Sequence, residues 1–459
     1  MRWWAWVAGA AAGAASVRLA LLPDRWVAAV VVGAWTTAGV LASGRVRRAA
    51  LVVFVLSLQV GLALYITEPA PAPSVGSSWP NSLALPLATL TALGALLVRP
   101  PGGWTWGGSQ ARCAAVLAAT TALSILGSPE PWIGVSHLAL MGGLSVILLA
   151  SANCVRDAGD LEAVERALLV ALVLQSLLYG LQTVLGATFT PAGEWIPSED
   201  GLGRYGGTVG ARPAMFSSFL LPLVLVALAH VLTSEERGAW RRYGVPAAAG
   251  AAAVILTVTR ASWIGLALGV GYLVAAAGRR RWLRRGRVAA LACILVMLVT
   301  ALAPKILARV SEDQAAAAEE RWSLVQMALR VIEAHPLAGV GAGAYPYVFR
   351  DYLTPELADK WLYVVHNVYV LRAAETGLLG AAAWVVFLAV AFRAARPERM
   401  RHPAARRLAL GWRAGLAALA WEMLWDVSLG PAANSLLWFL CGLMVAAGRL
   451  PETDGSAAA

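Results

Sequence analysis

The sequence predicts an all-α polytopic membrane protein with about 12–14 transmembrane helices and one long external helical loop. Of its 459 residues, 59% are hydrophobic and only 14% are charged, with a mean hydropathy of +0.66. An ordinary soluble domain carries about 25% charged residues, so this chain could not cover its surface with polar groups in water. The same composition excludes disordered, collagen-like and coiled-coil proteins.

Apolar runs long enough to cross a bilayer recur along the whole chain. A hydrocarbon core about 30 Å thick requires roughly 20 apolar residues in a helix. This criterion predicts fourteen spans, at approximately 3–22, 26–43, 49–67, 82–98, 111–127, 132–153, 162–187, 213–233, 245–259, 261–278, 288–304, 366–392, 408–427 and 434–448. The first segment has no convincing small-residue cleavage site, so we interpret it as a retained span and not as a signal peptide.

Basic residues between the runs predict the orientation. They form four clusters: Arg45 to Arg48, Arg237 to Arg242, Arg279 to Arg287, and Arg393 to Arg407. With fourteen spans all four clusters fall on one side, which the positive-inside rule assigns to the cytoplasm together with both termini. We expect the protein to lie in the inner (plasma) membrane of the cell. The net charge of +11 therefore reflects loops, and a nucleic-acid partner is not expected.

The chain divides into three expected parts. Residues 1–304 form transmembrane helices and include an external loop at 188–212. Residues 305–365 form a long external (periplasmic) helical loop, and residues 366–459 form the C-terminal transmembrane helices with a short cytoplasmic tail. A loop as long as 305–365 in a compact protein is usually functional.

The long loop carries its own helical pattern. Apolar residues at three- and four-residue steps predict a helix over 315–334; they are Trp322, Val325, Leu329 and Ile332. His335 and Pro336 end this helix, three alternating glycines (Gly339, Gly341 and Gly343) predict a turn, and a second short helix is expected within 344–360.

Arginines on the predicted external side indicate an anion site. Arg204 and Arg212 lie in the first external loop, Arg260 lies between two spans, and Arg321 lies in the long loop. An arginine at membrane depth usually marks function, and a planar guanidinium suits phosphate or pyrophosphate. Arg204 and Arg212 are also compatible with interfacial arginines that reach lipid headgroups, and Arg321 with an ion pair on a solvated helix.

His366 is the candidate catalytic residue. It lies where the span after the long loop begins, and a helix N-terminus favours the neutral imidazole. A neutral histidine can take a proton from a hydroxyl group. Asn367 beside it is a candidate to orient a substrate, while a histidine that only caps its own helix is the alternative.

Three further features complete the candidate site. Asp426, four residues after Glu422, is expected either to orient His366, to bind a sugar or to be a buried structural carboxylate. His335 before the glycine turn is a supporting candidate, although its position before a proline and a glycine turn favours a structural role. We expect no metal and no cofactor, since the four cysteines lack metal-site spacing and no nucleotide-binding motif occurs.

Five segments resemble the O-antigen ligase and O-antigen polymerase superfamily. The strongest is RWSLVQMALRVIEAHPLAGVGAGAYPYVF, from Arg321 to Phe349, with Val325 where the family often has tryptophan. The second is HNVYVLRAAETGLLG, which begins at His366. GRYGGTVGARPAMF is similar to the segment with the family's first arginine, TRASWIGLALG to the segment with its second, and WDVSLGPAANSLLWFLCGL to its closing segment with an aspartate. The resemblance covers roughly residues 160–448.

The resemblance implies a glycosyltransferase-C-like fold and a defined reaction. A glycan would move from an undecaprenyl-pyrophosphate-linked oligosaccharide to an acceptor hydroxyl, of lipid A core or of a growing polysaccharide, outside the membrane. Arg204, Arg260, Arg321 and Arg212 would bind the pyrophosphate, and His366 would deprotonate the acceptor with inversion. GARP replaces the usual segment at Arg212, which leaves the role of Arg212 the least well supported.

The sequence is also compatible with alternative functions. A polymerase of O-antigen or exopolysaccharide shares these motifs, as do relatives that glycosylate proteins. An anion transporter of the bicarbonate type would also use buried arginines, but the arginines here gather on one face and no inverted repeat is evident. A scaffold of a polysaccharide assembly complex would leave Arg260 and His366 without a role.

Overall fold

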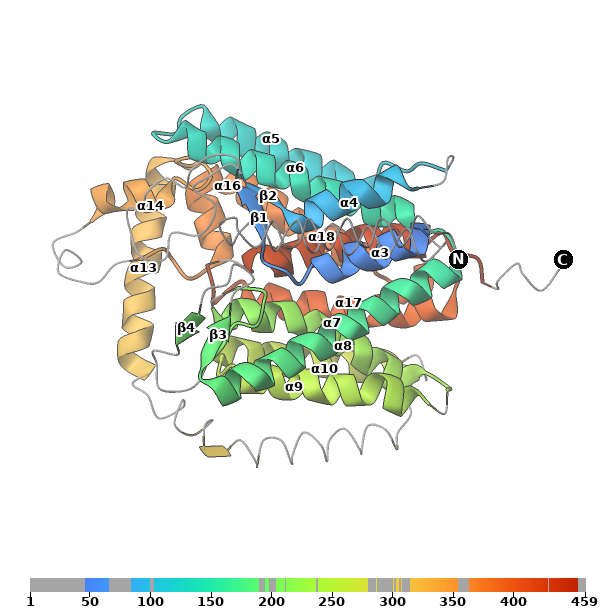
Figure 1. Cartoon of the computed structure of the whole chain (residues 1–459). Coiled ribbons are helices and arrows are strands. Elements are labelled where there is room, and N and C mark those ends of the chain that lie inside the picture. The colour runs from blue at the N-terminus through green and yellow to red at the C-terminus, as the bar shows by residue number, and fades with distance from the viewer. Residues whose placement is uncertain are drawn as a thin grey trace, which may run out of the picture.

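In the residues that it describes, the computed structural model is helical apart from two short strand pairs (Figure 1). It describes ten stretches of the chain and a few isolated positions between 286 and 307. These stretches are residues 46–65, 84–99, 103–189, 195–197, 204–210, 212–236, 238–279, 314–353, 363–427 and 429–452. The predicted all-α membrane architecture is confirmed.

Eleven of the fourteen predicted spans coincide with described helices. These are α3 (Val46–Ser57), α4 (Leu87–Leu97), α5 (Gly108–Ile125), α6 (Pro131–Cys154), α7 (Ala158–Leu185), α8 (Pro213–Thr233), α9 (Val245–Leu256), α10 (Arg260–Arg279), α16 (Val368–Ala394), α17 (Pro403–Glu422) and α18 (Gly430–Ala447). The spans predicted at 3–22 and 26–43, and nearly all of 288–304, lie outside the described residues. Six of the helices, namely α6, α7, α8, α10, α16 and α18, are long and apolar enough to cross a membrane.

The helices pack around α8 and α18. Both are apolar on every side and almost completely buried, as expected of central helices. α8 packs against α9, α10 and α17, and α18 packs against α6. By contrast, α7 exposes a stripe of large apolar side chains at helical spacing, which we interpret as its lipid-facing side: Leu174, Leu177, Leu181 and Val184.

Two glycines bring α17 into backbone contact with α8. Gly411 and Gly415 are four residues apart, the spacing at which small residues let membrane helices approach closely. A Cβ at Gly411 would overlap the Cα of Val226, and one at Gly415 would lie 2.8 Å from the Cα of Pro222. Because no side chain separates the two backbones here, these contacts fix the position of α17 along α8.

Two strand pairs replace helix at one end of the bundle. β1 (Ala63–Tyr65) pairs antiparallel with β2 (Ala84–Pro86), and β3 (Ala187–Phe189) pairs with β4 (Trp195–Pro197). The span predicted at 49–67 was therefore too long. Its helix ends at Ser57, and the backbone N–H of Gly61 instead donates to the carbonyl of Thr208.

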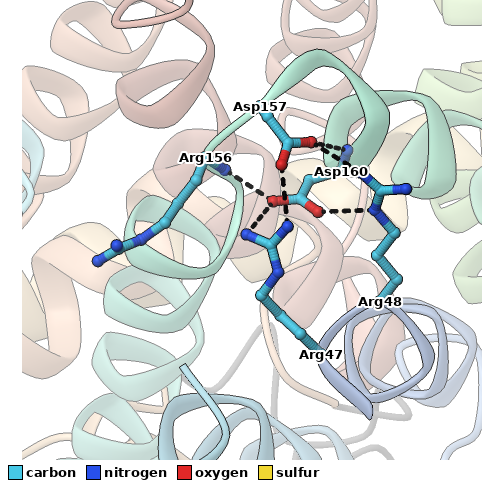
Figure 2. A network of polar contacts seen from close by, with 5 residues as sticks. All are labelled: Arg47, Arg48, Arg156, Asp157 and Asp160. Atoms are coloured by element: carbon cyan, nitrogen blue, oxygen red, sulfur yellow. Dashed lines mark hydrogen bonds and ion pairs between the residues drawn. The ribbon is translucent and has the colours of Figure 1, made fainter. Parts of the chain in front are cut away.

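An ion-pair network joins α3 to the start of α7 (Figure 2). Guanidinium nitrogens of Arg47 lie 2.9 Å from a carboxylate oxygen of Asp157 and 2.9 Å from one of Asp160. Those of Arg48 lie 3.3 Å from an oxygen of Asp157 and 3.2 Å from one of Asp160. Asp157 is also the N-cap of α7, where its carboxylate accepts from the N–H of Asp160 at 2.7 Å. Part of the first basic cluster thus fastens two helices together.

The basic clusters and the β3–β4 pair lie at opposite sides of the bundle. Arg241 precedes α9, Arg279 ends α10 and Arg393 lies in the last turn of α16, and these three helix ends share one side of the bundle. The connections that follow α7 and α9 and precede α8, α10 and α16 lie at the opposite side, with the β3–β4 pair and α13 (Gln314–Ala334) (Figure 1). The candidate arginines lie on this second side.

We predict that Gly411→Ala lowers the stability of the protein. The added methyl group has to displace the backbone of α8, and overpacking of this kind costs about 1–3 kcal/mol. Thermal unfolding of purified protein in detergent measures the change. Gly180→Ala on α7 is the matched control, because its Cβ would meet nothing within 4 Å. An unchanged melting temperature for Gly411→Ala would contradict the tight α8–α17 contact.

Candidate functional site

α13 covers the candidate site from the long loop. The predicted helix over 315–334 is confirmed, and the three glycines after it adopt positive φ angles in a turn. The side chains that α13 buries are Leu324, Met327, Ala328 and Val331, each fully inaccessible. They form a second apolar core with Tyr345 and Phe349 of the short helices α14 (Tyr345–Val348) and η2 (Phe349–Tyr352). Trp322, which helped to indicate the helix, is instead 58% exposed.

A break in α16 holds this loop in place. Gly377 has φ +69° inside the helix, so the carbonyls of Ala374 and Glu375 lose their usual partners in the next turn. The N–H of Val340 donates to Ala374 at 3.0 Å, and that of Gly341 donates to Glu375 at 2.9 Å. In return the N–H of Leu378 donates to the carbonyl of Pro336 at 2.8 Å. The turn after α13 therefore completes the hydrogen bonding of the broken helix.

The candidate residues surround one cavity of about 840 Å³. Its wall comes from the ends of α8, α10, α16 and α17, the connection before α10, and one face of α13. Seven of the eight predicted site residues line it: Arg204, Arg212, Arg260, Arg321, His366, Asn367 and Asp426. Residues more than 200 positions apart in the sequence thus meet at the side of the bundle opposite the basic clusters.

A strained connection presents Arg260 to the cavity. α9 ends at Leu256 and α10 begins at Arg260, so only three residues join them. The middle one, Val258, is buried at φ +54°, a conformation that β-branched residues rarely adopt and that concentrates at functional sites. The carbonyl of Thr257 accepts from Nε of Arg204 at 3.2 Å. The same connection therefore positions two of the arginines.

His366 has a defined tautomer. Its Nδ1 lies 3.0 Å from the carbonyl oxygen of Val364, which can only accept, so Nδ1 carries the hydrogen. Nε2 is then the basic nitrogen. The ring of Tyr363 packs edge-on against the imidazole, with centroids 4.8 Å apart. Val364, and not Asp426, thus orients Nδ1 of His366.

The surroundings keep His366 neutral. Burial lowers the pKa of its imidazole below the usual value, and the positive charges of Arg321 and Arg212 lower this pKa further, although the hydrogen bond to Val364 raises it. The direction of the net shift is downward. A neutral base is therefore available at physiological pH.

Asn367 and His335 both make hydrogen bonds within the protein. Asn367 is the N-cap of α16, where its Oδ1 accepts from the N–H groups of Tyr369 and Val370 at 3.0 Å each, so its oxygen holds the helix. His335 does not line the cavity: it is exposed, and its Nε2 lies 2.8 Å from the hydroxyl of Tyr352. Asp426 lines the cavity, and its Oδ1 accepts from the N–H of Val427 at 2.7 Å.

The cavity is also lined by residues that the sequence analysis did not propose for the site. Trp322 of α13 lines it, as do Trp421, Glu422 and Trp425 at the end of α17. α17 ends at Glu422, five residues before the predicted limit, which turns the following segment toward the cavity. The sequence signal that could have indicated these residues is the segment WEMLWD, in which two tryptophans lie beside two carboxylates.

We predict that Gly377→Ala releases the long loop from α16. A Cβ here would overlap the carbonyl of Leu337, and alanine disfavours φ +69°. Limited proteolysis should then cleave residues 336–353 several-fold faster than in the wild type. Gly142→Ala in α6, whose Cβ would meet nothing within 4 Å, should keep the wild-type rate. Equal protection of both variants would mean that the turn is held by other contacts.

Part of this site lies in a stretch that matches the model of a known protein family. Residues 245–385 match the family model described as O-Antigen ligase. The matched region runs from α9 into α16 and includes Arg260, Arg321 and His366. The resemblance in this stretch is thereby confirmed, while Arg204, Arg212 and Asp426 lie outside it. No curated protein matches the chain significantly.

Proposed function

We propose that this chain, a multi-pass membrane protein with an O-antigen ligase family domain over residues 245–385, is a glycosyltransferase that uses a polyprenyl-pyrophosphate-linked glycan. One observation carries the proposal: four arginines and a neutral histidine line the same cavity. The arginines suit the pyrophosphate of the donor, and the histidine suits activation of an acceptor hydroxyl. The donor is already activated, so the reaction needs neither a metal nor a nucleotide sugar.

The proposed reaction is a single displacement at the anomeric carbon. The acceptor oxygen bonds to this carbon while the bond from the carbon to the pyrophosphate oxygen breaks. The proton of the acceptor moves to Nε2 of His366, and the bonding electron pair leaves with undecaprenyl pyrophosphate. Arg204, Arg212, Arg260 and Arg321 stabilise the negative charge that develops on the leaving group. Attack opposite the leaving group inverts the configuration.

The orientation of the cavity supports an external reaction. The basic ends of the helices lie opposite the cavity, and basic ends face the cytoplasm under the positive-inside rule. We therefore propose that the site opens to the periplasm or the exterior. Acceptors of this reaction are lipid A core for a ligase, or a growing polysaccharide for a polymerase.

We predict that His366→Ala lowers transfer by about 10²–10⁴-fold, the usual contribution of a general base. The assay uses purified protein in detergent, an undecaprenyl-pyrophosphate oligosaccharide, and EDTA, with lipid A core as acceptor or with donor alone. The acceptor that yields product separates a ligase from a polymerase. His335→Ala is the matched control, because that histidine lies outside the cavity. If folded wild-type protein makes no product with either acceptor, the transferase proposal fails and an anion-flux assay in liposomes follows.

We predict that Arg321→Gln moves the acid limb of the pH profile. The base acts when neutral, so kcat/KM of the wild type should fall only as pH drops through the lowered pKa of His366. Removing the positive charge of Arg321 raises that pKa, and activity should then be lost at a higher pH. Arg330→Gln on the same helix is the control, since Arg330 is exposed and does not line the cavity. An acid limb that stays in place in Arg321→Gln would contradict the role of His366 as the titrating base.

A further inference from the structure

The end of α17 gives the cavity a wall that the proposed chemistry does not use. Trp421 and Trp425 line the cavity with their ring centroids 5.6 Å apart and their planes tilted by 52°. Glu422 lies between them in the sequence, and Trp322 of α13 contributes a third indole to the lining. None of these residues is needed to bind pyrophosphate or to remove a proton. A carboxylate beside a pyrophosphate site would even oppose binding of the anion.

A hydrogen bond from α10, itself supported by one from α8, fixes the carboxyl group of Glu422. Its side chain is only 3% exposed. Its Oε1 accepts from the hydroxyl of Ser262 on α10, and that hydroxyl in turn lies 2.7 Å from the hydroxyl of Ser217 on α8. Ser262 lies two residues after Arg260. The carboxyl group is therefore held at the same end of α10 as the pyrophosphate-binding arginine.

Two buried polar atoms of this wall have no hydrogen-bond partner within the described part of the chain. One is Oε2 of Glu422, and the other is Nε1 of Trp421. Buried donors and acceptors are almost always paired, by the protein or by a bound molecule. An interfacial tryptophan of a membrane protein would keep its N–H at the level of the headgroups, whereas this N–H is buried. The wall thus offers one donor and one acceptor beside aromatic faces.

This combination fits a sugar ring. A pyranose has an apolar C–H face that packs on an indole and hydroxyl groups that both donate and accept hydrogen bonds. An isoprenoid chain would use the indoles but leave both polar atoms unpaired. We propose that Trp421, Glu422 and Trp425 form a saccharide subsite of the cavity, next to its pyrophosphate-binding arginines. This inference rests on the proposed function, and the sugar is either the one attached to the donor pyrophosphate or one of the acceptor.

Binding of three probes by purified protein tests the subsite. The probes are undecaprenyl pyrophosphate, undecaprenyl pyrophosphate that carries one N-acetylglucosamine, and a delipidated lipopolysaccharide core oligosaccharide. Wild-type protein is compared with Trp425→Ala and Glu422→Gln. Trp425 is 43% exposed, so its replacement removes an indole face with little loss of packing, and thermal unfolding checks the fold of each variant. Trp106→Ala is the matched control, since Trp106 is an exposed indole paired with Trp104 away from the cavity.

If the subsite binds the sugar of the donor, the variants should lose affinity for the glycosylated lipid but not for the bare lipid. Wild-type protein should bind the glycosylated lipid about fivefold to tenfold more tightly than the bare lipid, as expected of one aromatic contact. Trp425→Ala should abolish this difference without changing the Kd of the bare lipid, and Glu422→Gln should reduce it. If the sugar belongs to the acceptor, the same two variants should instead weaken binding of the core oligosaccharide alone. Trp106→Ala should leave every Kd unchanged.

Three outcomes distinguish failure of the subsite from failure of the proposed function. Equal weakening of both lipids by Trp425→Ala would mean that the indole binds the isoprenoid chain, which overturns the subsite. Unchanged binding of all three probes by folded variants also overturns it. If wild-type protein does not bind bare undecaprenyl pyrophosphate, or binds it no more tightly than Arg260→Gln does, the proposed function itself fails.

Discussion

The geometry of the cavity depends on the break in α16 at Gly377. A continuous helix would use the carbonyls of Ala374 and Glu375 internally, and the turn at 336–341 would lose its hydrogen bonds to these two carbonyls. Because the break frees these groups, three backbone hydrogen bonds fasten the long loop to the helix that follows His366. Arg321 on α13 and His366 before α16 therefore keep a fixed relation, although 44 residues lie between them in the sequence. Backbone hydrogen bonds are well suited to this task, since they do not depend on flexible side chains.

Close packing between helices, and not hydrogen bonds from the long loop, holds the bundle beneath the cavity. Gly411 and Gly415 bring α17 onto the backbone of α8, and the Ser262, Ser217 and Glu422 contacts tie α17 to α10 and α8. Lipid provides little driving force for such contacts, so close van der Waals packing and hydrogen bonds between helices replace the hydrophobic effect. The three helix ends that carry site residues are consequently held together within the bundle and not by the external loop alone.

Charge is distributed unevenly between the two ends of the bundle. At one end, arginines are neutralised in part by Asp157 and Asp160 (Figure 2). At the other end, arginines line a cavity of about 840 Å³ together with Glu422 and Asp426. Burial and then the charges of Arg321 and Arg212 lower the pKa of His366. The clustered guanidinium groups also favour an anionic ligand there. One cavity thereby combines features that suit a pyrophosphate, a neutral base and a sugar.

The sequence by itself determined the membrane architecture, the positions of most helices and the residues of the arginine and histidine set. It could do so because hydrophobic runs, helix-ending glycines and prolines, and isolated arginines are local signals. Only the tertiary structure decided that Asn367 caps α16 and that His335 forms a hydrogen bond with Tyr352 outside the cavity. It also decided that Trp421 and Glu422 line the cavity. These outcomes depend on where distant helices end relative to one another. Periodicity along a single segment carries no information about that relation.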